Sequence, residues 1–343
     1  MAVVLNQLNI ATEQAYDSSI LNTELLSQDC VALRMLQDNA VRREGNPIKV
    51  KVRHKRNNGG AYTGFGPFDT TKVEQLAEGS LNWKNYYVDV TMDEDTIIEN
   101  TSMNIKQLMG VKSLKSLPAK GKAIINLIGV AMSGAIEDMK HLLATALWQT
   151  TPGALDMESI PNIVNMTSTY ASIANTALGT FDYDGLTSGS QDNIWAGRVD
   201  SNSGTNRSLD EEVLQKVIDD CSIGADVPKW GFCGRDAYRA LTLLLEGAKT
   251  RPNASVSEIG FTKNIEWVDY GVTFFRDEYC DKNEIYIINP KHMKLFFHPA
   301  LDMEFSGFKE PTNQPAITGQ LKVKLQLWCD DRAKQGLCDD VTV

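Results

Sequence analysis

The spacing of apolar residues divides the first half of the chain into a helical start and an extended middle. Leucines at roughly helical spacing predict a helical arm within Ser18–Asn39. The period changes to two at Ile48–Arg53, where apolar and basic residues alternate, and again at Tyr86–Met92. Between these predicted strands lies a glycine-rich excursion, Asn57–Trp83, longer than the roughly 12 to 15 residues of an ordinary loop. We therefore expect this excursion to be functional.

One long helix is predicted in the middle of the chain. From Pro118 to about Trp148, apolar residues recur at steps of three and four behind an initial proline. At ~1.5 Å per residue this helix would reach roughly 45 Å, which is longer than most globular domains need.

The second half of the chain mixes helical and extended patterns. Ser208 is expected to cap the first helix, because acidic residues fill the turn that follows it. The predicted elements are helices at Ser208–Cys221 and Gly234–Gly247 and strands at Ile265–Asp277, Glu284–Pro299 and Gln320–Asp331.

Composition fits a folded, acidic protein. The 343 residues suffice for two compact units, and 44 Asp and Glu against 34 Lys and Arg give a net charge of -10. This excess argues against a chain that coats nucleic acid or anionic membrane along its whole surface. The start of the chain lacks the pattern of a signal peptide, and the most apolar window, Ala123–Ile136, is shorter than the ~18 to 20 residues that span a bilayer.

Motifs for catalysis or metal binding do not stand out. The six cysteines are scattered without a CxxC pair, so we expect free thiols rather than a zinc site. The glycines at Gly64–Gly66 run into a proline rather than a helix, and the four histidines are dispersed. We therefore expect no catalytic residue, no cofactor and no bound metal, although a site assembled from distant residues stays open.

Charge counting suggests a partner for the basic strand. The segment Gly45–Glu99 contains seven bases and eight acids. Apolar residues occupy even positions in both Ile48–Arg53 and Tyr86–Met92, and the charges occupy odd ones. We expect these two strands to pair antiparallel, with one apolar face and one ladder of opposite charges. The predicted ladder sets Lys49, Lys51, Arg53 and Lys55 against Asp89, Asp93 and Asp95.

The predicted ribbon needs a further surface. An isolated hairpin is marginal in water, and its apolar face would lack a cover. The aromatic residues among the glycines are expected to be exposed at the tip of the ribbon, and they resemble the anchors of protein interfaces. We expect an arm that lies on a second copy of the chain and propagates into rings or lattices. The expected contact residues are Lys49, Lys51, Arg53, Lys55, Tyr62, Phe65, Phe68, Trp83, Asp89 and Asp93.

The order of these parts resembles the major capsid proteins of tailed bacteriophages, which have the α+β Hong Kong 97-type fold. The segments Asn193–Gly204, Leu209–Trp230 and Val268–Phe305 look like the axial domain of that family. The resemblance implies an N-terminal arm at 1–44, an extended β-hairpin loop at 45–99, a peripheral domain at 100–195 and 311–343 with its spine helix at 118–149, and an axial domain at 196–310.

The resemblance also implies a function. Hexamers and pentamers of the chain would form an icosahedral shell around double-stranded DNA without reading its sequence, in a virion assembled in the host cytoplasm. Scaffolding, portal and decoration proteins would be separate chains, and no membrane would take part. Some relatives crosslink a loop lysine to asparagine, a role open to Lys72 or Lys84. Two rivals remain: an encapsulin-like compartment, and a nucleic-acid-binding regulator that uses the basic strand 48–56.

Overall fold

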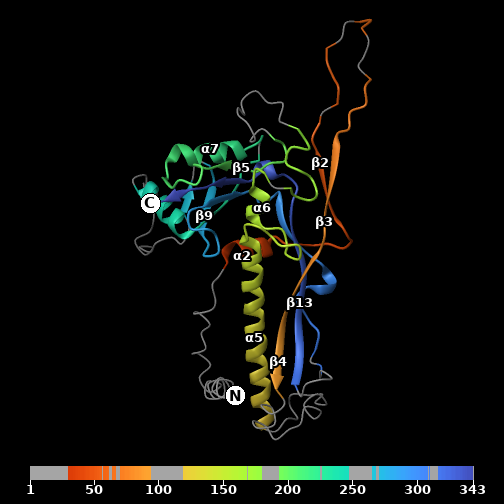
Figure 1. The fold of residues 1–343 in the computed structure, drawn as a ribbon, viewed down its shortest axis with the longest axis vertical. Coiled ribbons are helices and arrows are strands. Elements are labelled where there is room, and N and C mark those ends of the chain that lie inside the picture. The colour runs from red at the N-terminus through yellow and green to blue at the C-terminus, as the bar shows by residue number, and fades with distance from the viewer. Residues whose placement is uncertain are drawn as a thin grey trace. The chain divides into compact units, whose positions relative to one another are not determined.

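The protein is described here from a computed structural model (Figure 1). It describes residues 30–55, 57–61, 64–66, 70–93, 119–167, 169–179, 193–224, 226–246, 265–267, 270–307, 309 and 316–342. The chain forms two compact units. The described residues of the first unit come from Asn85–Leu143 and His298–Lys324, and those of the second from Asp29–Lys84, Ala144–Phe297 and Leu325–Val343.

A six-stranded sheet forms the centre of the second unit. Its strand order is β5-β14-β10-β7-β9-β8. Neighbouring strands are parallel in the pairs β5–β14 and β7–β9 and antiparallel in the other three. The strands are β5 (Arg198–Asp200), β7 (Trp230–Cys233), β8 (Ile265–Trp267), β9 (Val272–Arg276), β10 (Ile285–Ile288) and β14 (Gly336–Cys338).

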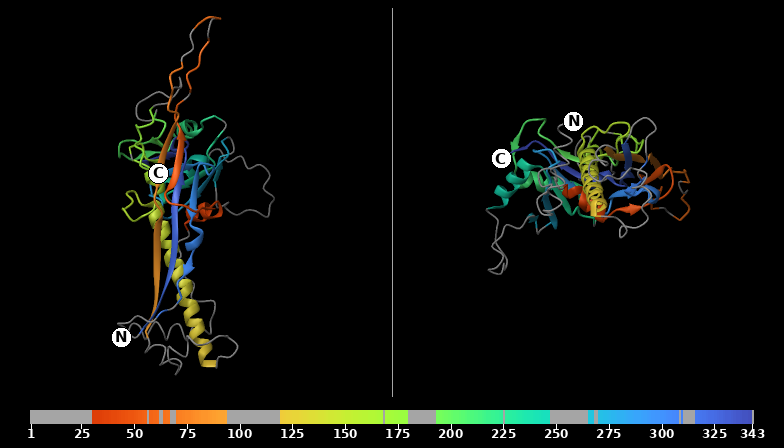
Figure 2. Two further views of the ribbon diagram at one scale, coloured as in Figure 1. Left: turned by 90° about the vertical axis from the view of Figure 1, so that its right-hand side faces the viewer. Right: turned by 90° about the horizontal axis from the view of Figure 1, so that it is seen from below.

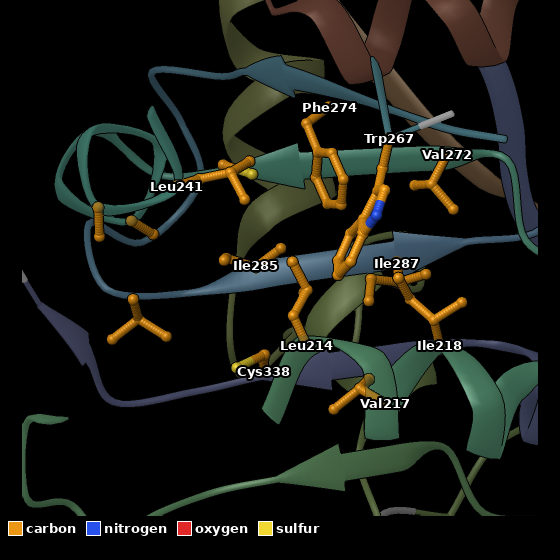
Figure 3. Close-up of a cluster of buried hydrophobic side chains, with 14 of the residues drawn as sticks. Leu214, Val217, Ile218, Leu241, Trp267, Val272, Phe274, Ile285, Ile287 and Cys338 are labelled. Carbon is orange, nitrogen blue, oxygen red and sulfur yellow. The ribbon is translucent and has the colours of Figure 1, made fainter. Parts of the chain in front are cut away.

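Helices α7 (Glu211–Cys221) and α8 (Arg235–Glu246) bury one face of this sheet. Figure 3 shows Leu214 of α7 near Ile285 of β10, with Phe274 of β9 in the same cluster. Both helices match the predicted segments, but the residue that caps α7 is Asp210. Ser208 belongs instead to a short strand, β6 (Arg207–Ser208), which pairs with β15 (Val341–Thr342).

The other face of the sheet receives the end of the long helix. Phe232 and Tyr286 alternate with the core residues of their strands and therefore point away from α7 and α8. The ring of Trp148 meets the ring of Tyr286 at 5.1 Å and that of Phe232 at 6.2 Å between centroids. This contact fixes the last residue of α5 against the sheet.

The predicted long helix is confirmed as α5 (Ala119–Trp148), with 30 residues. In the first unit its buried side chains, Ala135, Met139 and Leu143, recur every four residues along one stripe. Figures 1 and 2 both show this part of α5 running beside β4 (Lys84–Asp93) and β13 (Ala316–Cys329). No helix in the described residues is both long and apolar enough to cross a membrane.

A second sheet has five strands along β13. Its order is β1-β11-β13-β12, and β4 pairs with β13 as well. In the second unit the antiparallel register joins Met293 to Cys329, and in the first unit it joins Phe305 to Leu321. The remaining elements are β1 (Val41–Arg42), β11 (Met293–Phe297), β12 (Glu304–Phe305), α2 (Val31–Asp38), α6 (Ile160–Val164), η4 (Pro299–Leu301) and η5 (Arg332–Lys334).

Helix α2 confirms the described part of the predicted N-terminal helix. A buried carboxylate from a distant part of the second unit holds its first turn. Asp277 accepts a hydrogen bond from the backbone nitrogen of Ala32 at 2.9 Å and one from the thiol of Cys30 at 3.3 Å. Burial raises the pKa of Asp277, and these hydrogen bonds act in the opposite direction.

Candidate functional site

Strands β2 (Ile48–Arg53) and β3 (Leu76–Leu81) form an antiparallel hairpin, which we call the β2–β3 hairpin (Figure 1). The register joins Ile48 to Leu81 and Arg53 to Leu76. It continues past the strands, because the backbone nitrogen of His54 donates to the carbonyl oxygen of Gln75 at 3.0 Å. The predicted alternation of β2 is confirmed: its apolar residues are buried and its basic residues are exposed.

The predicted partner of β2 was wrong. Strand β2 pairs with β3, whereas β4, which contains Asp89 and Asp93, pairs with β13. The sequence LAEGSL of β3 lacks a clear alternation, because Leu76 is exposed and Gly79 carries no side chain. The alternation of apolar and charged residues is clearer in β4 than in β3, so the sequence favoured β4 as the partner of β2.

Among the described residues of the hairpin, one ion pair, with a different partner, takes the place of the predicted charge ladder. Lys49 contacts Glu78 at 2.5 Å, with both side chains about half exposed. The hydrogen bond from Lys49 lowers the pKa of the Glu78 carboxyl, and the charges of Lys49 and Lys51 add to this effect. Asp89 lies exposed on β4, and the side chain of Asp93 lies outside the described residues.

The apolar face of the hairpin is covered by the same chain. Ile48 is 1% exposed and Val50 is 0% exposed. A tight turn meets this face at Gly79, where an added Cβ would lie 2.5 Å from the carbonyl oxygen of Ala171. The same oxygen accepts a hydrogen bond from the backbone nitrogen of Ser80 at 2.9 Å. The expectation that this face needs a second copy as its cover was therefore wrong.

The turn that meets Gly79 is conformationally unusual. Ala171 and Ser172 both have positive φ, 52° and 64°, which costs non-glycine residues on the order of 1 kcal/mol or more each. Tyr170 secures the turn, because its buried hydroxyl accepts a hydrogen bond from the backbone nitrogen of Cys329 at 2.7 Å. The ring of Tyr170 also lies under the guanidinium of Arg332, 5.8 Å from its centroid. The hairpin is thus attached to the rest of the second unit at a defined point.

Arg332 organises the backbone around this turn. It is fully buried, and burial lowers its pKa to about 10. Its guanidinium donates to four carbonyl oxygens of the segment that precedes β5. These acceptors are Ile163 at 2.7 Å, Asn165 at 2.7 Å, Trp195 at 3.1 Å and Asn162 at 3.3 Å.

The opposite face of the hairpin lies entirely in solvent. We call it the exposed hairpin face, and its centre is Leu76, with 68% of its surface accessible. Five cations and two carboxylates share this face, which gives it a net charge of +3. By register and alternation the face comprises Lys49, Lys51, Arg53, Lys55, Asn57, Lys72, Glu74, Leu76, Glu78 and Ser80, all exposed.

The other predicted contact residues fall in different places. Phe65 is fully exposed in the excursion beyond the hairpin. Trp83 is only 8% exposed, and its indole nitrogen donates to the carbonyl oxygen of Gly45 at the base of the hairpin, so its prediction as an exposed aromatic was wrong. Tyr62 and Phe68 lie outside the described residues. Lys72 is exposed, whereas Lys84 donates to the carbonyl oxygen of Ala154 at 2.5 Å.

Thiols and potential metal ligands are dispersed through the described residues. The predicted free thiols are confirmed: all six cysteines are unpaired and buried. Burial raises the pKa of each thiol, which disfavours the reactive thiolate. The described part of the chain contains no group of three or more His, Cys, Asp or Glu residues placed to hold a metal ion.

His292 has structural partners. Its Nδ1 lies 2.8 Å from Asp330, and its Nε2 lies 3.4 Å from Asp226. Asp226 also pairs with Lys291 and Lys334, whose hydrogen bonds hold the pKa of its carboxyl far below the ordinary value. These contacts tie neighbouring loops together.

No protein-family model matches the sequence, and no curated protein matches it. Solved structures do match. The capsid asymmetric unit of cyanophage A-1(L) has a TM-score of 0.62 at 13% identity, over 92% of this chain and 93% of that chain. The capsid of a native GTA particle gives 0.53 at 9% identity, over 90% of both chains. The SrpI encapsulin of Synechococcus elongatus PCC 7942 gives 0.50 at 13% identity, over 91% of this chain and 87% of that chain.

These likenesses show the fold of the chain. It is an α+β capsid fold of the Hong Kong 97 type, as the sequence predicted, and the match extends over nearly the full length of both chains. The proteins compared are shell-forming structural proteins.

Proposed function

We propose that this chain is the major capsid protein of a tailed bacteriophage. Copies of it assemble into an icosahedral shell of hexamers and pentamers around the double-stranded DNA genome. The observation that carries the proposal is the likeness to the cyanophage A-1(L) capsid subunit, with a TM-score of 0.62 over more than nine tenths of both chains. Because identity is 13%, this likeness supports the function through the fold alone.

The exposed hairpin face supports assembly. It combines five cations, two carboxylates and an exposed leucine on a hairpin whose other face is already buried. Such a patch differs from the rest of the acidic chain, so it favours contact with a different surface on the next copy. A heterologous contact of this kind propagates into rings or shells. We propose Lys49, Lys51, Arg53, Lys55 and Phe65 as contact residues, with Tyr62 and Phe68 in the same excursion.

The remaining parts of the proposal follow from a mechanical role. The chain acts without catalysis, and its net charge of -10 keeps the wall from holding DNA tightly during packing and release. Scaffolding, portal and decoration proteins are separate chains, assembly takes place in the host cytoplasm, and the mature location is the virion. The four-part division into N-terminal arm, extended loop, peripheral domain and axial domain belongs to this proposal.

Expression of the full chain tests the function. We expect closed, uniform shells in negative-stain electron microscopy of the purified protein, alone or with a scaffolding protein from the same genome. Particles isolated from infected cells should contain this chain as their most abundant protein and double-stranded DNA inside. Virions built from another polypeptide, with this chain present only as monomers, would contradict the proposal.

An encapsulin-like compartment is the second candidate. The likeness to the SrpI encapsulin, with a TM-score of 0.50, favours it. The contents of native particles decide between the two candidates. Shells that carry a co-purifying protein cargo and no genome-length DNA would support the compartment.

A further inference from the structure

The exposed hairpin face has four cations without an ion-pair partner among the described residues. Lys49 is paired with Glu78, whereas the other four cations of the face have no carboxylate within ion-pair distance in that part of the chain. Three of these four are Lys51, Arg53 and Lys55, and the fourth is Lys72. Glu74 lies opposite Lys55 by the register that His54 and Gln75 continue. The face therefore carries unbalanced positive charge at regular two-residue spacing.

This charge contrasts with the rest of the molecule. The face carries +3 and the whole chain carries -10, which leaves -13 on all remaining residues. The rest of a second copy therefore carries an excess of carboxylates that could pair with the cations of this face. Complementary potentials of this kind steer association and select one orientation of the two partners.

We infer that the exposed hairpin face binds an acidic surface of a second copy of this chain, whose carboxylates surround an apolar spot that receives Leu76. The inference rests on the proposed shell function and adds the chemistry of the partner surface. Lys51, Arg53 and Lys55 pair with the partner's carboxylates, and Leu76 is buried between them.

A nucleic acid fits the same face less well. A phosphate backbone would lie against the carboxylates of Glu74 and Glu78, which are interleaved with the cations. It would also cover Leu76 without offering an apolar partner, although 68% of that residue is exposed at the centre of the face. A protein surface can place an apolar side chain there and carboxylates around it.

Charge reversal tests the inference in the full-length protein. The variant Lys51→Glu/Arg53→Glu/Lys55→Glu should raise the protein concentration needed for assembly at least tenfold. The control Lys229→Glu/Arg239→Glu/Lys282→Glu makes the same change in net charge at three other exposed cations. It should assemble like the wild type, and equal losses in both variants would overturn the inference in favour of a general charge effect.

The dependence of assembly on ionic strength distinguishes the ion pairs of the contact from the burial of Leu76. Raising the ionic strength from 0.1 to 1 M shortens the screening length from ~10 Å to ~3 Å, so wild-type assembly should weaken. The variant Leu76→Ser should also assemble less well, by a factor that does not depend on salt. Normal assembly of Leu76→Ser would remove the leucine from the contact.

Carboxyl–amine coupling identifies the partner surface. Particles assembled from an equal mixture of ¹⁴N- and ¹⁵N-labelled chains are treated with a zero-length carbodiimide and analysed by mass spectrometry. We expect mixed-isotope crosslinks that join Lys51 or Lys55 to Asp or Glu residues. Only same-isotope crosslinks at these lysines would overturn the inference.

The outcomes distinguish this inference from the shell function. If the wild type forms no particles, the shell proposal fails. If the wild type and the hairpin variant form particles equally well, the shell proposal stands and the inference fails. Binding of a labelled 30-base-pair duplex that the hairpin variant loses, with unchanged assembly, would assign the face to nucleic acid instead.

Discussion

The six-stranded sheet and the β2–β3 hairpin use the same alternation of residues to different ends. In the sheet, α7 and α8 cover one face and Trp148 meets the other, so residues such as Phe274 and Tyr286 are buried by their own chain. In the hairpin one face is buried at the Tyr170–Ile173 turn and the other is exposed along its whole length. The sheet is thus buried on both faces by its own chain, whereas the hairpin leaves one face exposed, which we propose as a contact with another copy.

The largest difference between the two regions should appear on removal of a phenylalanine ring. Phe274→Ala leaves a cavity in the sheet core and should lower the free energy of unfolding by ~3 to 5 kcal/mol, measured by urea denaturation of the unassembled subunit. Phe65→Ala, at a fully exposed residue, should leave the denaturation curve unchanged and weaken assembly. Equal effects of the two changes on unfolding would contradict the contrast.

The next largest loss of stability is expected on substitution of Arg332, because this residue anchors the backbone beside the hairpin's attachment point. Arg332→Lys cannot reach four carbonyl oxygens, and buried acceptors left without donors should cost ~2 to 4 kcal/mol in the same measurement. Arg276→Lys is the matched control, since Arg276 is about half exposed and pairs with Glu278 alone among the described residues. A control that destabilises as strongly would show that the carbonyl contacts are not the cause.

A methyl group at the base of the hairpin should disturb the attachment itself. Gly79→Ala sets a Cβ 2.5 Å from a backbone oxygen, and the required shift should cost ~1 to 3 kcal/mol. Gly60→Ala has open space around its Cβ and should be neutral. Hydrogen exchange at the β2 and β3 amides reads out the difference, and unchanged protection in Gly79→Ala would show that the turn does not hold the hairpin.

The smallest effect on stability is expected from a carboxyl group at the end of the interior strand β10. Glu284 precedes β10 and faces Asp339 across the β10–β14 register. Burial, together with the charges of Asp281, Asp339 and Asp340, raises the pKa of its carboxyl from 4.5 to about 7. The folded state therefore keeps a proton that the unfolded state loses, so this contribution to stability is complete below pH 4.5 and is lost as the pH rises to about 7.

Glu284→Gln should remove that dependence. Between pH 4.5 and 8 the free energy of unfolding of the wild type should fall by on the order of 1 to 2 kcal/mol more than that of the variant. Urea denaturation of both proteins across this pH range measures the difference. The hydrogen bond that the Tyr286 hydroxyl donates to Glu284 at 2.7 Å remains possible with glutamine. Parallel pH profiles for the two proteins would show that Glu284 is not the group responsible.

The elements with strong periodicity could be predicted from sequence. The boundaries of α5 agree with the pattern from Pro118 to Trp148, and the alternation of Ile48–Arg53 gave the correct buried and exposed sides of β2. These features depend on residues a few positions apart. They survive in any tertiary arrangement that buries the apolar side.

Pairing partners could not be predicted in the same way. The sequence of β3 contains an exposed leucine and a glycine, so its apolar and polar residues do not alternate, although the burial of its residues does. The reason for Gly79 becomes visible only when the Ala171 carbonyl lies against it. The burial of Trp83 depends on a distant contact with Gly45. As a result, Leu76, Glu74 and Glu78 were absent from the predicted contact set, although the structure places all three on the exposed hairpin face.

A cryo-electron microscopy map of the assembled particle tests the central claim most directly. The account predicts density for the β2–β3 hairpin with Lys51, Arg53 and Lys55 against carboxylates of a neighbouring copy and Leu76 covered by an apolar side chain. A closed shell in which this face remains in solvent, or lies against nucleic acid, would contradict it.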